Sequence, residues 1–305
     1  MNNFIKSKEA QKVVIFMHIP KAAGTTLRYI IQYQANPLAV YEAYGSSSTH
    51  RQRLESLKNL STTDRNKIKI VNAHFGFGLH EFLDRQFTYI TMLRHPVERV
   101  ISMYYYLCRT RPSFAKEVDL EDFVKSRVSF TKNDMTKYFS GIKLQIQMQA
   151  STRSEDDLDK DYSLTSQTLE LAKRNLKEHF SVVGISSEFE ETLVLLRKIL
   201  GWKLPLYYRS NVSKQRPSLR NIPQSTLFLI EEYNDLDIQL YSYAQAFFRE
   251  LIQQQGSSFA QEVEELKKAN QTSRLKPYYT MRSYYNRITH RVYKELVGYS
   301  SSLSS

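Results

Sequence analysis

Apolar positions in this chain gather in a few short segments that have the length and composition of buried strands. The segments at residues 13–17, 68–73, 87–93 and 182–185 are rich in Val, Ile and other apolar residues. Runs of this kind are typical of parallel sheets, in which helices cover both faces. Each segment therefore predicts a strand.

Between these segments, apolar residues recur at the spacing of one helix face. Pro96 suits the first turn of a helix, where its missing N–H costs nothing. Val97 and Val100 follow at helical spacing, whereas Arg99 and Ser102 fall on another face. Further helices are expected at about residues 27–31, 51–60, 119–126, 134–139, 165–180, 187–200 and 225–254.

The alternation of strands and helices predicts an α/β fold with a mainly parallel sheet flanked by helices. Residues 1–255 would form this domain, and the acidic segment 154–161 would be a solvated loop. After the hinge signal at 256–258, residues 256–305 predict a basic, tyrosine-rich helical tail with a disordered end. We expect its helix to pack on the same chain, although an anionic glycan, a membrane surface or another subunit are alternatives.

Composition narrows the classes of protein that the chain can represent. The 305 residues carry 43 Lys and Arg against 31 Asp and Glu, a net charge of +12 that favours an anionic partner. The single cysteine, Cys108, excludes a disulfide within the chain and a multi-cysteine zinc site. No stretch reaches 18 apolar residues and the first residues lack an apolar core, so neither a transmembrane helix nor a signal peptide is expected.

Ligands of parallel α/β sheets bind at the carboxyl ends of the strands, and the turn after the first strand is rich in candidate chemistry. It reads His-Ile-Pro-Lys-Ala-Ala-Gly-Thr-Thr-Leu from His18. A turn that opens into a helix presents backbone N–H groups to an anion, Lys21 adds a charge, and Thr25 or Thr26 would cap the helix. A Walker A loop is excluded because the lysine precedes Gly24. The alternative is a plain turn with a solvated lysine.

The end of the third strand opens into Leu-Arg-His-Pro-Val-Glu-Arg-Val-Ile-Ser-Met-Tyr-Tyr from Leu93. Together the two segments resemble the carbohydrate O-sulfotransferases of the uronosyl 2-O type and their bacterial relatives. That family has a phosphosulfate loop x-x-Pro-Lys-x-(Ala/Gly)-(Gly/Ser)-Thr and a 3′-phosphate motif Arg-x-Pro-x-Glu-Arg-x-x-Ser-x-Tyr-Tyr. The second motif occurs in full, and the first is matched with Gly24 and Thr25 one position later. The likeness spans roughly residues 13–220.

The resemblance implies a fold like that of the P-loop kinases and the sulfate donor 3′-phosphoadenosine 5′-phosphosulfate (PAPS), with 3′-phosphoadenosine 5′-phosphate (PAP) as product. Lys21 would contact the 5′-phosphate and stabilise charge on the leaving group. Arg94 and Ser102 would bind the 3′-phosphate, or would instead be a surface ion pair and a neutral helix residue. The remaining contacts to the 5′-phosphate would come from Ala22, Ala23, Gly24, Thr25 and Thr26.

His74 follows the second strand, where the family has a histidine that acts as general base. A sugar hydroxyl is a weak nucleophile, and histidine titrates in the range needed to take its proton. The alternative is a buried histidine that is only hydrogen-bonded. Asn72 stands where some members of the family have a second histidine.

The remaining candidates carry weaker signals. His18 is expected to orient the phosphate loop, and His95 replaces a common aspartate beside Arg94. Cys108 is expected to be a buried, unreactive residue. The histidines without a motif, expected at the surface, are His50, His80, His179 and His290. The basic segment around residues 207–217 resembles the late nucleotide loop of the family, or is simply solvated; its candidate contacts are Ser213, Lys214 and Arg216. No group of residues has metal-ligand spacing.

The sequence thus predicts a PAPS-dependent O-sulfotransferase that acts on a hydroxyl of a carbohydrate or glycoconjugate by in-line displacement. Without an apparent anchor we expect a cytoplasmic, bacterial enzyme that uses neither nucleic acid nor a metal. The alternatives are a non-catalytic protein that binds anionic glycans or nucleotides, and a kinase of similar architecture. Neither the acceptor nor the oligomeric state can be derived from the sequence.

Overall fold

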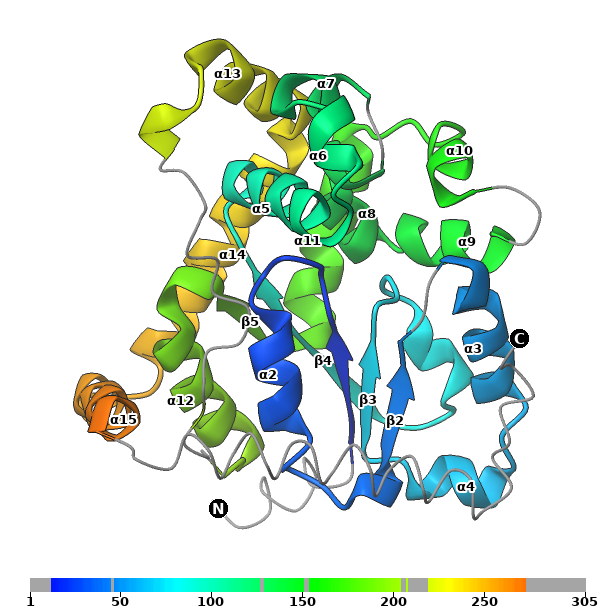
Figure 1. Cartoon of the computed structure of the whole chain (residues 1–305). Coiled ribbons are helices and arrows are strands. Elements are labelled where there is room, and N and C mark those ends of the chain that lie inside the picture. The colour runs from blue at the N-terminus through cyan, green and yellow to red at the C-terminus, as the bar shows by residue number, and fades with distance from the viewer. Residues whose placement is uncertain are drawn as a thin grey trace.

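The computed structural model describes residues 12–44, 47–126, 129–150, 154–203, 207 and 219–272, and these build one parallel sheet covered by helices (Figure 1). The sheet has five strands in the order β2-β3-β1-β4-β5, and every pair is parallel. This confirms the predicted fold class. The strands are β1 (Val13–Met17), β2 (Val40–Ala43), β3 (Ile70–Ala73), β4 (Phe87–Leu93) and β5 (Phe180–Ile185).

Helices fill the connections between the strands and both faces of the sheet. Figure 1 shows α2 and α12 on one face and α11 and α14 on the other. The α-helices are α2 (Gly24–Ile31), α3 (Ser47–Lys58), α4 (Thr62–Lys67), α5 (Pro96–Thr110), α6 (Phe114–Glu117), α7 (Leu120–Lys125), α8 (Asp134–Ser140), α9 (Ile142–Gln149), α10 (Glu155–Asp159), α11 (Ser166–His179), α12 (Phe189–Leu200), α13 (Gln224–Tyr233), α14 (Asp235–Gln253) and α15 (Phe259–Thr272). Short 3-10 turns lie at Pro37–Ala39, Leu79–Phe82, Ser129–Thr131, Ser186–Glu188 and Leu219–Asn221.

Strand β1 is the centre of the core, because it lies between β3 and β4 and all five of its residues are buried. The parallel register pairs Met17 with Ala73 of β3 and with Thr91 of β4. The backbone N–H of His18 donates to the carbonyl of Ala73 at 2.8 Å, so the chain stays in register one residue beyond β1. The segments that follow these three strands therefore open at the same edge of the sheet.

Two elements differ from the prediction for reasons visible in their local structure. Strand β2 was not predicted; it is only four residues long and half of it is partly exposed, so its apolar signal is weak. The helix expected at 225–254 is divided into α13 and α14 at Asn234. The buried Asn234 amide donates to the carbonyls of Thr131 and Ile230 and accepts from the N–H of Asn133, bonds that favour a break at this residue.

The acidic segment 154–161, expected as a solvated loop, contains α10 instead. Buried charged contacts hold this helix against the domain. Glu155 accepts from His50 Nδ1 at 2.6 Å and pairs with Lys143 Nζ at 3.1 Å. The prediction that His50 lies at the surface is therefore wrong. Arg99 is also fully buried, and its guanidinium donates to Asp134 at 3.0 Å.

The first helix of the predicted tail packs on the sheet domain. Lys198 of α12 pairs with Glu262 of α15 at 2.7 Å, and Lys267 of α15 pairs with Glu191 of α12 at 2.8 Å. The turn before α15 contains Gly256 at a φ of 82°. None of the helices in the described ranges is both long and apolar enough to cross a membrane.

Removal of one partner from a buried ion pair leaves an uncompensated charge, which predicts a large loss of stability at Arg99. We expect Arg99→Met to lower the free energy of unfolding by about 3–5 kcal/mol, because Asp134 would lose its hydrogen-bonded partner and keep only Lys143, whose Nζ lies 3.8 Å from the other carboxylate oxygen. Urea unfolding followed by circular dichroism measures the change. Arg51 pairs with Glu55 on the exposed face of α3, so Arg51→Met serves as the control, with an expected change of about 0–1 kcal/mol. An Arg99→Met protein within 1 kcal/mol of the parent would contradict the assigned role of this pair.

Candidate functional site

The β1–α2 loop, residues 18–23, lies at the carboxyl edge of the sheet and leads directly into the first turn of α2. Lys21 and Ala23 both adopt left-handed backbone conformations, with φ of 69° and 62°. Such conformations cost non-glycine residues energy and are concentrated at functional sites. The helix begins at Gly24 after Ala23, which has no side-chain acceptor, so the expected cap by Thr25 or Thr26 is not formed. The N–H groups of Thr26 and Leu27 donate to the carbonyl of Ala23, whereas those of Gly24 and Thr25 point from the helix start toward a further acceptor.

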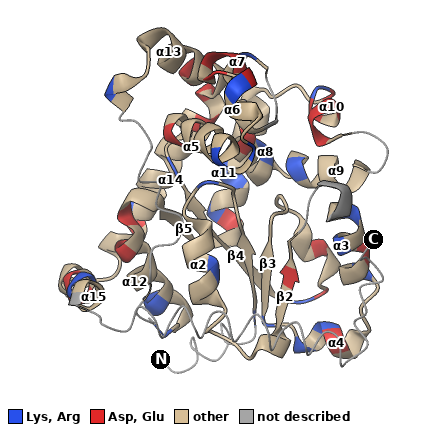
Figure 2. Ribbon diagram, viewed as in Figure 1, with Lys and Arg blue, Asp and Glu red and all other residues tan. Residues whose placement is uncertain are grey.

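Lys21 is the cation of this loop, and an aromatic ring from α5 holds it in place. Its Nζ lies 4.0 Å from the centroid of the Tyr106 ring, and the guanidinium carbon of Arg109 lies 5.8 Å from the same centroid. Figure 2 shows the basic position on the loop between β1 and α2, next to α5 in this view. Burial, with repulsion from Arg109 and Arg94, lowers the pKa of Lys21 to about 8. Three cations thus converge on one region, which an anion would stabilise.

A polar stripe on α5 connects this region with the start of the helix. Glu98, Ser102, Tyr106 and Arg109 follow one another at intervals of four, four and three residues, and therefore share one face of α5. Ser102 is half-buried, and the turn from Ser102 to Tyr106 spans about 6 Å along the axis. The stripe therefore extends the 3′-phosphate motif by two residues, Tyr106 and Arg109, that the sequence analysis did not select. Their continued helical spacing was the signal that could have found them.

Arg94 follows β4 and stands at the N-terminal end of the stripe. Its Nε and one terminal nitrogen both donate to the same oxygen of Glu98, at 3.0 and 2.8 Å. Glu98 thus supplies the carboxylate partner that His95 does not, since His95 is exposed with its ring against Tyr241. The Arg94–Glu98 pair is partly solvent-exposed, and such pairs contribute only about 0–1 kcal/mol. A phosphate can compete with a contact of this strength.

His74 follows β3 and is held on several sides. Its Nε2 lies 3.1 Å from His18 Nδ1, and its carbonyl accepts from Gln147 Nε2 at 2.8 Å and from the Tyr138 hydroxyl at 3.4 Å. Burial, with repulsion from His50 and Arg28, lowers the pKa of His74 to about 3. The imidazole is therefore neutral at physiological pH and can accept a proton. An anion bound nearby would raise this pKa, because negative charge stabilises the protonated ring.

Asn72 and Glu42 form a second polar group beneath the site. The buried Asn72 amide donates to Glu42 at 2.9 Å, and Glu42 also accepts from Gln32 and pairs with Arg28. Arg28 in turn lies 3.9 Å over the ring of Tyr44. The charge of Arg28 is therefore already balanced by the carboxylate of Glu42.

Other predicted residues lie apart from this arrangement or outside the described residues. Cys108 is half-buried on α5, not fully buried as expected. His80 and His179 stack with Phe87 at the opposite edge of the sheet, where burial and His179 lower the pKa of His80 to about 4. The residues Ser213, Lys214, Arg216 and His290 lie outside the described residues. Within the described residues, no group of three His, Cys, Asp or Glu side chains could hold a metal ion.

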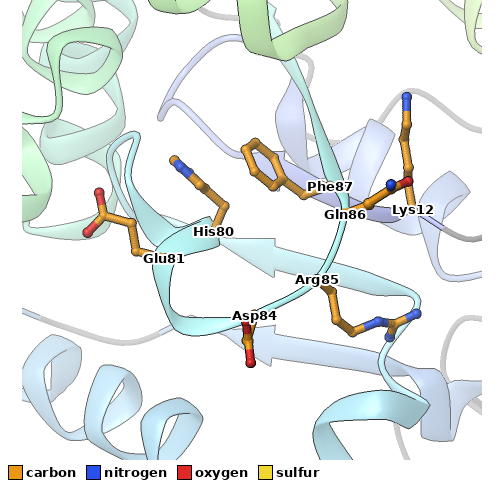
Figure 3. A pocket seen from close by; sticks show the side chains of 7 residues that line it. All are labelled: Lys12, His80, Glu81, Asp84, Arg85, Gln86 and Phe87. Carbon is orange, nitrogen blue, oxygen red and sulfur yellow. The ribbon is translucent and has the colours of Figure 1, made fainter.

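A pocket on the molecule lies away from the converging cations. It is lined by residues at the amino-terminal ends of β1 and β4 and by the turn at Leu79–Phe82 (Figure 3). Its lining contains two basic residues, Lys12 and Arg85, and two acidic residues, Glu81 and Asp84. The pocket therefore has no concentrated charge of one sign. Parallel α/β sheets bind their ligands at the carboxyl edge, which favours the Lys21 region over this pocket.

The low pKa of Lys21 predicts unusual reactivity with amine reagents. At pH 8 about half of the Lys21 side chains would be neutral and nucleophilic, whereas an ordinary lysine is almost fully protonated. We expect acetic anhydride at pH 8 to modify Lys21 at least about tenfold faster than Lys116, an exposed lysine of α6. Peptide mass spectrometry measures both rates. Equal rates, with modification of Lys21 rising only above pH 10, would contradict this environment.

The chain is similar to a described family of enzymes and to several named mammalian proteins. Residues 3–278 match the family described as galactose-3-O-sulfotransferase. Human galactose-3-O-sulfotransferase 3 is 27% identical over 274 residues, which cover 85% of this chain and 61% of the relative. Human uronyl 2-sulfotransferase is 26% identical over 184 residues, 54% of this chain and 40% of the relative. Mouse galactosylceramide sulfotransferase is 32% identical over 120 residues, 35% of this chain and 27% of the relative.

These similarities correct one expectation and limit another. The mammalian relatives are Golgi-type carbohydrate sulfotransferases, so the expectation of a cytoplasmic protein is wrong. Because they are mammalian, they give the bacterial assignment no support. The aligned part of the chain spans about 40 to 60% of the length of the galactose-3-O-sulfotransferase 3 and uronyl 2-sulfotransferase relatives.

Proposed function

The chain belongs to the galactose-3-O-sulfotransferase family, and from this membership we propose that it transfers a sulfuryl group from PAPS to a hydroxyl of a carbohydrate or glycoconjugate. The observation that carries the proposal is the convergence of Arg109 and Arg94 on Lys21 in the loop that leads into α2, one strand away from His74. An anion site and a neutral base at the same edge are the two parts that sulfuryl transfer to an alcohol requires.

The donor would lie along the polar stripe of α5. Lys21 and the loop from Ala22 to Thr26 would hold the 5′-phosphosulfate, because N–H groups at a helix start favour negative charge. Arg94 and Ser102 would hold the 3′-phosphate, and a guanidinium offers the planar fork that suits phosphate oxygens. Arg109 would add a second cation at the 5′ end. Ser213, Lys214 and Arg216 would close over the 3′-phosphate or ribose.

In the transfer, the acceptor hydroxyl would attack sulfur while His74 takes its proton. The new bond joins the acceptor oxygen to sulfur, and the bond between sulfur and the phosphate oxygen breaks, with its electron pair left on PAP. Lys21 and the amides of α2 would stabilise that developing charge, in a partly buried place where electrostatic interactions are stronger than in water. The mechanism needs no covalent enzyme intermediate and no metal.

The acceptor would be a neutral or uronyl sugar, since relatives of both names match this chain. The arrangement around His74 favours the neutral sugar. Arg28, the cation beside it, is paired with Glu42, so it offers no free charge for a uronate carboxylate. We therefore propose a galactose-containing glycan as the acceptor. Residues 1–255 would form the transferase domain, with α15 of the tail packed on it.

Transfer of radioactive sulfate from labelled PAPS to β-galactosides tests the proposal. We expect incorporation by the parent protein and a loss of about 10²–10⁴-fold in kcat in His74→Ala, because this change removes the base. Lys21→Ala is expected to lose activity to a similar degree, because it removes charge stabilisation of the leaving group. Full activity of either variant would contradict the role assigned to that residue.

Binding of PAP, followed by thermal shift, separates the donor site from the chemistry. PAP at about 100 times its dissociation constant would add roughly 2.7 kcal/mol of stability, and AMP would add less because it lacks the 3′-phosphate. We expect Arg109→Gln to weaken PAP binding about tenfold, a loss of about 1.4 kcal/mol. Arg111, exposed just after α5, provides the matched control. No shift with PAP, or equal effects of Arg109→Gln and Arg111→Gln, would contradict the proposed donor site.

A further inference from the structure

We propose that His18 is a positioning residue that connects the base to the donor site. Its acceptor nitrogen fixes the tautomer of His74, and its ring sets the position of the first turn of α2. This inference rests on the proposed sulfuryl transfer, which gives His74 its role as base.

His18 lies between the two parts of the site that it would connect. It directly follows β1, and its ring stacks on Phe16 with the centroids 5.2 Å apart. The edges of the rings of His74 and Tyr44 face it, at centroid distances of 4.5 and 5.6 Å. Because β1 and β3 are parallel and in register, His18 and His74 occupy equivalent positions after neighbouring strands.

The hydrogen bonds around His18 Nδ1 determine which nitrogen of His74 carries the proton. Tyr44 donates or accepts at 2.9 Å from this nitrogen, and His74 Nε2 lies 3.1 Å from it. Burial raises the pKa of Tyr44 well above its ordinary value, so the phenol keeps its proton. Within the described residues, His18 Nδ1 is the one hydrogen-bond partner of this hydroxyl. An unpaired O–H would be costly in this buried place, and the hydroxyl therefore donates to His18.

A nitrogen that accepts from Tyr44 carries no proton of its own. His18 Nδ1 then has no proton to donate to His74, and its one lone pair is shared between the Tyr44 hydroxyl and a proton on His74 Nε2. The Nδ1 of His74 is therefore the bare nitrogen. Burial lowers the pKa values of both imidazoles well below 7, which keeps both rings neutral. The free lone pair of His74 Nδ1 is the atom that a base requires. The opposite arrangement would leave His74 without a free lone pair.

On its other side, the His18 ring lies against the start of α2. A Cβ added at Gly24 would lie 2.1 Å from His18 Cδ2 and 2.2 Å from its Nε2. No ordinary contact is that short, so a side chain at Gly24 and this ring exclude each other. The ring therefore sets how closely the first turn of α2 approaches the end of β1.

The proton balance during transfer follows from this tautomer. The acceptor proton moves to His74 Nδ1, and the ring becomes an imidazolium with protons on both nitrogens. The hydrogen bond from His74 Nε2 to His18 then has a charged donor, which makes it stronger than in the resting site. His18 thereby stabilises the protonated base through its neighbour without touching the substrate. The proton leaves His74 to water after the products dissociate.

Nitrogen NMR on protein labelled with ¹⁵N-histidine tests the tautomer without any turnover. Correlations from ring carbons to nitrogens distinguish a protonated Nε2 from a protonated Nδ1, and His74→Ala identifies the signals among the seven histidines. We expect His74 protonated at Nε2 and His18 bare at Nδ1 in the free protein at pH 7. A His74 that is protonated at Nδ1, or that exchanges between tautomers, would overturn the proposal.

Two variants of His18 separate its two contacts. His18→Asn keeps an acceptor near the place of Nδ1 but removes the ring beside Gly24, so we expect a higher KM for PAPS with kcat within about threefold. His18→Leu keeps apolar bulk but removes the acceptor, so kcat should fall about 10–100-fold with little change in KM. His80→Asn is the control, since His80 also bonds a tyrosine hydroxyl, Tyr89 at 3.0 Å, but at the far edge of the sheet.

The outcomes distinguish this inference from the proposed function. If the parent protein is active and His18→Leu keeps kcat within about threefold of the parent value, the positioning role of His18 is overturned. Equal changes of both kinetic constants in the two His18 variants also overturn it, because they indicate a merely structural residue. A parent protein that neither binds PAP nor transfers sulfate overturns the function instead. If His18→Leu has a lowered melting temperature, the NMR result on the parent protein decides.

Discussion

The parallel pairing of β1 with its two neighbours is the constraint on which the site depends. A sheet in which β1, β3 and β4 run in the same direction brings three carboxyl ends to one edge. The register places His18 beside His74, and a slip of one residue would turn the side chains that follow β3 to the opposite face. His74, the β1–α2 loop and Arg94 lie at one edge of the sheet because of this parallel arrangement and not because they are near one another in sequence.

At this edge of the sheet, the two faces of α5 have different surroundings. One face packs into an apolar cluster through Val97, Val100 and Ile101, and Arg99 extends it into the interior with an ion pair. The other face carries the polar stripe from Glu98 to Arg109 that lies over the β1–α2 loop. The buried face fixes the helix, so the stripe is presented as a rigid surface. In the proposed function, rigid presentation of charge, rather than the total charge of +12, would select a bound anion.

The sequence predicted those elements and residues whose structure depends on neighbouring residues in the chain. Four of the five strands, the start of α5 at Pro96, and Lys21 and Arg94 at strand ends all follow from residues within one short window. The two motif segments also identified the family. They could not identify the partners of Arg99 or His50, because Asp134 and Glu155 lie 35 and 105 residues away.

The roles of single side chains depended most on distant contacts. A threonine after a glycine is a usual helix cap, but the cap of α2 is the strained Ala23, two residues before Thr25. Tyr44 gave no sequence signal, because its contact is with His18 of another element. The helical spacing of Tyr106 was visible in the sequence, but its contact with Lys21 was not. The requirement for glycine at position 24 is visible only once the His18 ring is in place.

A crystal structure of the protein with PAP would test the proposed donor site. We predict the 5′-phosphate within hydrogen-bond distance of Lys21 Nζ and the first N–H groups of α2, and the 3′-phosphate on Arg94 and Ser102. We also predict that His18 stays against Gly24. A nucleotide bound at the opposite edge of the sheet, beside His80 and Phe87, or a 3′-phosphate that does not reach Arg94, would contradict it.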